Sequence, residues 1–209
     1  YIVAHKGAPD QITSVSIDMS PAFIKGVTEH LPNARITFDK FHVVAHASAA
    51  VDKMRRLEQR TTPSLKGFRS TLLKDRDSLS NEARADLDNL ILQAPTKRTA
   101  RAWLYREHLR EILHRKQINV ASVMLTQWCA NVMRSKVEPM KEVARMIKKH
   151  FEGIVAWTQT RLNNGFIEAL NGLFQAAKRK ARGYKRFETM RTVLFLIAAK
   201  LDFAQIKSQ

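Results

Sequence analysis

The stretch ITSVSIDMSPAFIKGVTEHLPNARITFDKFHV, residues 12–43, decides the fold that this sequence predicts. Its first part, residues 12–18, alternates two sets of side chains and is rich in β-branched residues, which predicts a strand ending at Asp18. A Ser-Pro pair then supplies an N-cap and a first helical residue, and apolar residues at helical spacing predict a helix over 19–31. Residues 35–43 predict a second short strand. A strand, helix and strand in this order normally form a parallel pair with a right-handed crossover.

The chain changes character after this stretch. Between Val43 and Trp157 no alternating strand pattern occurs, and apolar residues recur at helical spacing. We therefore expect a mixed α/β, predominantly α fold in three parts: a strand–helix–strand start over 1–45, an all-helical insertion over 46–157, and closing helices over 158–209. The helices expected in the middle of the chain cover roughly 43–60, 80–93, 98–116, 119–135 and 138–157.

The charge of the chain is unusual for a globular protein of 209 residues. It holds 36 lysines and arginines against 19 acidic residues, which gives a formal net charge of +17. Such an excess indicates a polyanionic partner, since each neutralised phosphate releases condensed counterions. No apolar run reaches the roughly 18 residues that a membrane-spanning helix needs, so we expect no membrane partner and favour nucleic acid.

Four residues of the helical middle are expected in the core. Cys129 lies in an apolar helical stretch, where a buried structural thiol is expected rather than a nucleophile. As the single cysteine, it excludes a disulfide within the chain and fits a reducing cytoplasm. The tryptophans on apolar helical faces are also expected in the core; they are Trp103, Trp128 and Trp157.

Acidic residues lie at the end of the first predicted strand and near the end of the second. Open α/β sheets bind their ligands at the carboxyl ends of strands, so Asp18 is a candidate site residue, with helix capping as the alternative. If the second strand continues through residue 43, Asp39 and His42 point to opposite faces of the sheet. A structural role in the turn is the default expectation for both of them.

The segment RLNNGFIEALNGLFQAAKRKARGYKRF, residues 161–187, predicts a helix with one polar and one apolar face. A break at Gly183 and Tyr184 ends this helix, and a closing helix is expected over 187–203. The polar stripe runs from amides and a carboxylate to cations, which suits a metal ion at one end and phosphates at the other. A solvated face is the alternative interpretation, although such a face normally mixes more glutamates among the lysines. The stripe consists of Asn164, Glu168, Asn171, Gln175, Lys178 and Arg182.

Six cations crowd the end of this segment, within nine positions and without an acidic residue among them. Like charges at this density repel one another unless a polyanion lies nearby. We therefore expect them to contact the DNA backbone, which gives affinity but little sequence information. A solvated basic surface is the alternative. The six cations are Lys178, Arg179, Lys180, Arg182, Lys185 and Arg186.

Two motif blocks resemble a bacterial insertion-sequence transposase of the IS-L-three family. The first block is SIDMSPAFIKGVTEHLPNARITFDKFHVVAHASAAVDKMRR, residues 16–56, and the second is TRLNNGFIEALNGLFQAAKRKARGYKRFETMRTVLFL, residues 160–196. The resemblance covers essentially the whole chain. It implies the DDE class of transposases with a ribonuclease-H-like fold, in which a mixed sheet bears two aspartates and a later helix bears a glutamate.

The resemblance assigns Asp18 to the second acidic ligand and Glu168 to the third. It implies Mg²⁺ or Mn²⁺ as cofactor, ions that prefer oxygen ligands, and phosphodiester hydrolysis followed by strand transfer. If the register of the sheet differs, Asp39 is the second ligand instead, Asp18 is a cap, and His42 orients Asp39 or touches a scissile phosphate. Further candidates for supporting roles are Asn164 and Asn171.

Several parts that the resemblance implies have no counterpart in this sequence: the first acidic ligand, a zinc-binding part and a helix-turn-helix part. We therefore expect a C-terminal fragment that is inactive alone, from a protein that acts at the nucleoid in the bacterial cytoplasm. Its expected partners are transposon ends, target DNA and further copies in a homo-oligomer. The alternative function is a non-catalytic basic helical DNA-binding protein. That alternative explains the charge, but not an aspartate at a strand end together with an amide-flanked glutamate.

Overall fold

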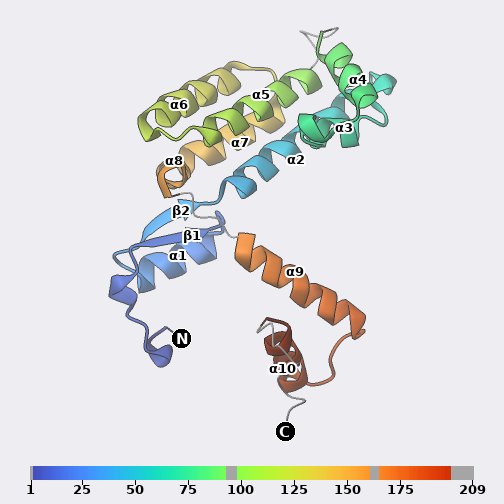
Figure 1. Ribbon diagram of the computed structural model, residues 1–209. Helices are drawn as coiled ribbons and strands as arrows, with labels where there is room; N and C mark the ends of the chain where they lie inside the picture. The colour runs from blue at the N-terminus through green and yellow to red at the C-terminus, as the bar shows by residue number, and fades with distance from the viewer. Residues whose placement is uncertain (1, 93–97, 161–164, 199–209) are drawn as a thin grey trace. The chain divides into compact units, whose positions relative to one another are not determined.

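The structure is a computed structural model that describes residues 2–92, 98–160 and 165–198 (Figure 1). The chain divides into two compact units, residues 1–162 and 163–209. Helices dominate the described residues, whose only sheet is a parallel pair of strands. The prediction of a mixed α/β, predominantly helical fold is confirmed at this level. No helix in the described part of the chain combines the length and apolarity needed to cross a membrane.

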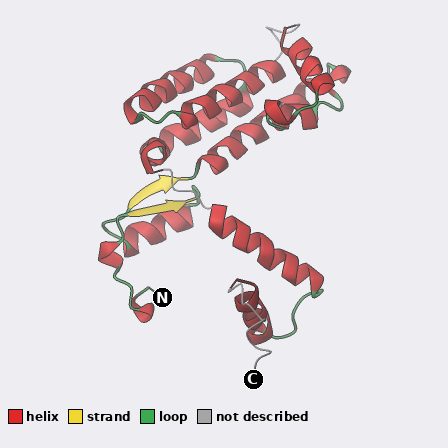
Figure 2. Cartoon of the chain, viewed as in Figure 1, coloured by secondary structure: helices red, strands yellow, loops and turns green. Residues whose placement is uncertain are grey.

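The first unit begins with the predicted strand, helix and strand (Figure 2). Strand β1 (Ser14–Ile17) is followed by α1 (Pro21–His30) and then by β2 (Arg35–Phe38). The two strands run parallel, and Ile17 lies opposite Phe38 at their carboxyl ends. The predicted strand–helix–strand start is therefore confirmed, with β1 shorter than the predicted strand.

The second strand ends five residues earlier than its sequence predicts. Helix α2 (Lys40–Glu58) begins directly after Asp39, whose Oδ1 accepts a hydrogen bond of 2.9 Å from the Phe41 backbone N–H. This N-cap satisfies one of the amide groups that a helix start leaves without a partner, so the chain turns into a helix here. The prediction of a strand over 35–43 is wrong, and the strand faces assigned to Asp39 and His42 do not apply.

Five of the predicted helical runs are helical in the structure, four of them to within three residues at each end. The fifth, predicted as one helix over 138–157, is two helices that meet at His150. The helices of this part are α4 (Asn81–Leu92), α5 (Arg98–His114), α6 (Ile118–Arg134), α7 (Glu138–Lys149) and α8 (Phe151–Thr160). Short helices that periodicity did not reveal are η1 (Val3–His5), η2 (Pro9–Gln11), η3 (Pro63–Leu65), α3 (Arg69–Leu73) and η4 (Arg76–Ser78).

The break at His150 lets α8 turn and cover β2. A Cβ atom added at Gly153 would lie 2.5 Å from the Phe38 ring and 3.2 Å from the Ile36 carbonyl oxygen, so only glycine permits this close approach. The His150 ring packs edge-on against Phe38, with ring centroids 5.0 Å apart. Burial lowers the pKa of His150, and the Lys149 charge acts in the same direction.

The hydrophobic core runs through the helices of the first unit and reaches β2. Trp103, Trp128 and Trp157 are all buried, and the Trp128 indole N–H donates a 2.9 Å hydrogen bond to the Tyr105 carbonyl. Cys129 is also buried, and its burial raises the pKa of the thiol to about 11 while the Lys148 charge opposes the change. These core predictions are confirmed.

The second unit consists of α9 (Gly165–Lys180) and α10 (Phe187–Ala198). The predicted break between them is confirmed at Arg182 and Gly183, which have φ angles of 51° and 96°. The Gly183 backbone N–H donates to the Lys178 carbonyl at 3.0 Å and closes the end of α9. Glycine is favoured at position 183 because it has no Cβ atom and therefore adopts the left-handed conformation without a steric penalty.

Candidate active site and nucleic-acid interface

Asp18 and Asp39 are the residues that directly follow the two paired strands. Because Ile17 lies opposite Phe38 in a parallel register, both aspartates leave the sheet at its carboxyl edge. The Asp39 backbone N–H donates to the Ile17 carbonyl at 3.4 Å, so the pairing persists to this point. The fold thus brings two carboxylates to neighbouring strand ends, the place where open α/β sheets bind ligands.

Asp18 is the more accessible of the two carboxylates. Its side chain is half-buried, and its Oδ1 accepts a 2.7 Å hydrogen bond from the Ser20 backbone N–H at the start of α1. Ser20 occupies the N-cap position, but its own side chain makes no capping hydrogen bond. Within the part of the chain that the structure describes, Asp18 Oδ2 accepts no further hydrogen bond. The capping interpretation of Asp18 therefore accounts for one of its two oxygens.

Asp39 is fully buried and is the N-cap of the 19-residue helix α2. A buried carboxylate is tolerated when hydrogen bonds replace its water, and the Phe41 N–H supplies one of them. His42 is half-buried in the first turn of the same helix. Asp39 and His42 therefore lie next to the candidate edge on a helix start, and the structure gives Asp39 a definite structural function.

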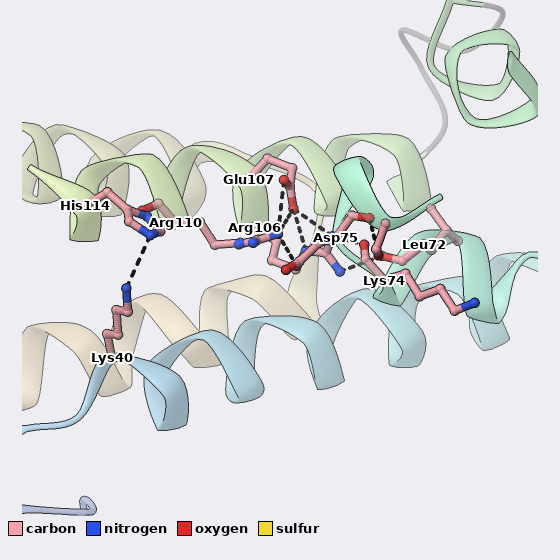
Figure 3. A network of polar contacts seen from close by, with 9 residues as sticks. Lys40, Leu72, Lys74, Asp75, Arg106, Glu107, Arg110 and His114 are labelled. Carbon is pink, nitrogen blue, oxygen red and sulfur yellow. Dashed lines mark hydrogen bonds and ion pairs between the residues drawn. The ribbon is translucent and has the colours of Figure 1, made fainter. Parts of the chain in front are cut away.

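A polar network joins the start of α2 to helix α5 (Figure 3). Lys40 Nζ lies 3.2 Å from His114 Nε2, and His114 Nδ1 lies 2.7 Å from the Arg110 carbonyl oxygen. Since a carbonyl only accepts, the Nδ1 atom carries the proton and Nε2 accepts from the ammonium group. Lys40 Nζ also lies 4.9 Å from the centroid of the Trp157 ring, within reach of a cation–π interaction.

The same network continues from α5 to the segment around α3 (Figure 3). Arg106 is 1% exposed, forms an ion pair with Glu107 at 2.6 Å and donates to the Leu72 carbonyl at 2.5 Å. Arg110 forms a second ion pair with Asp75 at 2.7 Å. Helix α5 thus contacts Lys40, the first residue after Asp39. No sequence pattern connects Lys40 with a histidine 74 positions away, so sequence reasoning missed this connection.

The third candidate ligand, Glu168, belongs to the second unit. Its backbone lies in α9, and its side chain lies outside the described residues. Asn164 also lies outside the described residues. Asn171 is exposed on α9, one helical turn after Glu168. The predicted helix around Glu168 is confirmed, whereas its approach to Asp18 stays a prediction.

The cations predicted to contact DNA surround the end of α9. All six are exposed, and among the described residues none of them forms an ion pair with a carboxylate. The turn that carries them is closed by the left-handed Arg182 and Gly183, and the Tyr184 hydroxyl donates to the Ala177 carbonyl at 3.5 Å. The six cations are Lys178, Arg179, Lys180, Arg182, Lys185 and Arg186. The arrangement is a turn of exposed lysines and arginines, the side chains that most often contact phosphate oxygens.

The donor set at the carboxyl edge fits a hard divalent cation. Carboxylate oxygens are the ligands that Mg²⁺ and Mn²⁺ prefer, and such ions are bound by one or two carboxylates together with substrate phosphates. Within the residues that the structure describes, no group of three histidines, cysteines, aspartates or glutamates could hold a metal ion. Among the described residues, the edge therefore holds two carboxylates but no complete ligand set.

The sequence is similar to those of known transposases. A family model for ISL3 transposases, described as "Transposase", matches residues 2–194. The transposase for insertion sequence element IS1001 of Bordetella parapertussis is 28% identical over 187 residues, which cover 86% of this chain and 46% of that protein. The transposase for insertion sequence element IS1557 of Mycobacterium tuberculosis is 29% identical over an alignment of 217 positions, which covers 90% of this chain and 48% of that protein.

This chain therefore spans about half the length of the curated relatives that it matches. No solved structure matches it. The family match covers the first motif block and all but the last two residues of the second, from the strand that precedes Asp18 into the helix that follows the cationic turn. The chain belongs to the ISL3 family of transposases.

Proposed function

We propose that this chain is part of the catalytic domain of a DDE transposase that cleaves and joins DNA phosphodiesters with divalent metal ions. The observation that carries the proposal is the position of Asp18. It follows β1 at the carboxyl edge of a parallel pair and keeps one oxygen outside its capping interaction. A capping aspartate with a second, accessible oxygen suits a metal ligand in a chain of this family.

The catalytic core that we propose is ribonuclease-H-like and is built from two distant parts of the chain. Residues 1–45 contribute the parallel strands, residues 158–209 contribute the helix with Glu168, and residues 46–157 form a helical insertion between them. The parallel strand–helix–strand start and the continuous helical middle support this division.

The metal ligands that we propose are Asp18 and Glu168. Two ions, when bound, activate the attacking oxygen and stabilise the leaving oxygen of the phosphodiester. Asp39 is the alternative ligand to Asp18, but its full burial and its cap on α2 favour a positioning role. Supporting roles near the ligands are proposed for His42, Asn164 and Asn171.

The nucleic acid that we propose is duplex DNA at transposon ends and target sites. The cationic turn, Lys178 to Arg186, contacts its backbone through charge rather than through base edges. Paired DNA ends are brought together by a homo-oligomer of the transposase, at the nucleoid in the bacterial cytoplasm. The exposure of the six cations supports this contact.

The shared metal site can be tested by iron-directed cleavage of the protein at a high Fe²⁺ concentration, which compensates for the weak binding expected of a site without its first acidic ligand. Fe²⁺ replaces Mg²⁺ at carboxylate sites and, with ascorbate and peroxide, produces hydroxyl radicals that cut the backbone near the ion. We expect cuts around both Asp18 and Glu168, mapped by mass spectrometry. Because both carboxylates hold the same ions, either Asp18→Asn or Glu168→Gln removes both sets of cuts.

The matched control is Asp10→Asn, which changes an exposed carboxylate near the start of the chain and leaves both sets of cuts in place. Asp39→Asn also leaves them in place if Asp18 is the ligand. Cuts around residue 168 that persist in the Asp18→Asn protein contradict a shared site. If only Asp39→Asn removes them, Asp39 is the ligand.

A second function is supported by the cationic turn alone. A basic helical protein that binds DNA without catalysis needs exposed cations without carboxylate partners, and the described end of α9 provides them. That function predicts DNA affinity that falls steeply with salt, together with no localised iron cleavage. The iron experiment therefore separates the two functions.

A further inference from the structure

The insertion carries a dense cationic segment of its own, at the end of α2 and in the turns that follow. From Lys53 to Lys74 the sequence holds seven lysines and arginines and a single acidic residue, Glu58. All of these residues are described by the structure, in which α3 lies beside α2 (Figure 1). The seven cations are Lys53, Arg55, Arg56, Arg60, Lys66, Arg69 and Lys74.

Asp52 gathers three guanidinium groups from this segment. Arg55 forms the closest pair, with Nη2 at 2.8 Å and Nε at 2.9 Å from Asp52 Oδ1. Arg56 Nε lies 3.3 Å from Oδ2, and Arg69 Nε lies 3.7 Å from Oδ1. The Asp52 cluster is defined here as Asp52, Arg55, Arg56 and Arg69. One carboxylate offsets one of its three positive charges, so the cluster keeps an excess of two.

The excess charge lies on the surface. Arg55 is buried, whereas the side chains of Arg56 and Arg69 are 66% and 67% exposed. Each guanidinium presents several N–H donors in a fixed plane, so a pair of them on one surface matches the oxygens of phosphate groups. The two exposed guanidinium groups therefore form a surface that suits an anion, and ion pairs with Asp52 hold them in place.

The nearby carboxylates do not offset this excess. Glu58 turns toward α5, where its Oε1 accepts from the Arg98 N–H at 2.9 Å and its Oε2 accepts from the Thr99 N–H at 2.8 Å. Glu142 of α7 lies 3.0 Å from Lys53 Nζ and offsets that cation. Neither carboxylate forms an ion pair with Arg56 or Arg69 among the described residues.

We infer that the Asp52 cluster binds the phosphate backbone of duplex DNA and forms a second contact surface, separate from the cationic turn after α9. The inference rests on the proposed function, because a chain that acts on DNA exposes this surface to a long polyanion. Arg60 and Lys66, which are also exposed, add charge on the same segment. The insertion thereby becomes a DNA-holding element as well as a scaffold for α2.

The test is the salt dependence of DNA binding by the 209-residue chain, measured by fluorescence anisotropy with a short duplex of unrelated sequence. The variant is Arg56→Ala/Arg69→Ala, which keeps the buried Asp52–Arg55 pair. Loss of two phosphate contacts makes the negative slope of log K against log salt shallower by about 1.8. Arg56→Lys/Arg69→Lys keeps the charges and is expected to keep a slope near that of the wild type.

The matched control is Lys25→Ala/Arg76→Ala, which removes two exposed cations that each have a carboxylate partner, Glu29 and Asp88. This control is expected to leave the slope unchanged. An unchanged slope in the Arg56→Ala/Arg69→Ala protein, with circular dichroism like that of the wild type, overturns the inference. If the wild-type chain itself binds no DNA, the proposed function fails as well, so the two failures are distinguishable.

Discussion

At the scale of single residues, Gly153 determines how closely helix α8 covers the strand that leads to Asp39. An added Cβ would meet the Phe38 ring at 2.5 Å and the Ile36 carbonyl at 3.2 Å. Phe38 is 5% exposed and belongs to the core, so its ring has little room to move away. The packing of α8 on the strand that leads to Asp39 therefore requires that residue 153 have a hydrogen atom where other residues have a side chain.

We expect Gly153→Ala to lower the free energy of unfolding by about 1–3 kcal/mol, the usual cost of overpacking a core. Gly26→Ala is the control, because Gly26 lies inside α1 and nothing lies within 4 Å of its added Cβ. That change is expected to raise the free energy of unfolding by about 0.5–1 kcal/mol through better helix propensity. Urea denaturation measures both. Equal effects of the two substitutions would contradict the close contact.

At the scale of elements, Glu58 links the end of α2 to the start of α5. It accepts hydrogen bonds from the first two backbone N–H groups of α5, at 2.9 and 2.8 Å, and so caps a helix that begins 40 positions later. Burial raises the pKa of Glu58, but hydrogen bonds from Thr99 and Arg98 and the Arg98 charge outweigh it and leave the pKa below its ordinary value. The folded state therefore favours the ionised carboxylate.

The cap makes stability depend on pH in a defined direction. Because the pKa is lower in the folded state than the ordinary 4.5, the contribution of Glu58 is complete above about pH 4.5 and is lost as the pH falls through the folded value. We expect Glu58→Ala to cost about 0.5–2 kcal/mol at pH 7, the range for lost helix caps, and less at low pH.

Urea unfolding of both proteins at several pH values measures this difference. Glu29→Ala serves as the control, since Glu29 forms only an exposed pair with Lys25 at 3.7 Å. A Glu58→Ala penalty that stays constant from pH 7 to pH 3 would show that the carboxylate does not act as a cap.

At the scale of the whole molecule, the core belongs to the first of the two units. Its buried cluster extends from Phe38 to Val155 and includes Trp103 and Trp128, and the third tryptophan, Trp157, is also buried in this unit. We expect a chain ending at residue 162 to stay folded, because none of its described core residues comes from beyond that point.

Tryptophan fluorescence during urea unfolding checks this expectation, since it reports on the first unit alone. The shortened and the complete chains should have the same emission maximum and nearly the same transition midpoint. Red-shifted emission in the shortened chain before urea is added would mean that the second unit is needed to complete the core. Far-ultraviolet circular dichroism provides an independent check, because loss of α9 and α10 alone removes a known share of the helix.

Much of the fold could be predicted from local sequence. The strand–helix–strand start, four helices of the insertion and the break at Gly183 follow from side-chain periodicity, capping residues and glycine conformation, all of which act over a few residues. Burial of Trp128 and Cys129 follows from the same periodicity. The extension of the second strand to residue 43 was wrong because β-branched residues alone do not reveal that Asp39 caps a helix.

The candidate site could likewise be predicted only in part from local sequence. The sequence by itself determined that an aspartate follows a strand, that a glutamate lies on a helix between amides, and that six cations follow it, because these are properties of neighbouring residues. Only the tertiary structure decided that Asp18 and Asp39 share one sheet edge, that His114 contacts Lys40, and that Arg69 joins the local arginine partners of Asp52. The physical reason is distance along the chain: hydrogen bonds and ion pairs between residues far apart in sequence form only where packing of the helices brings those residues together.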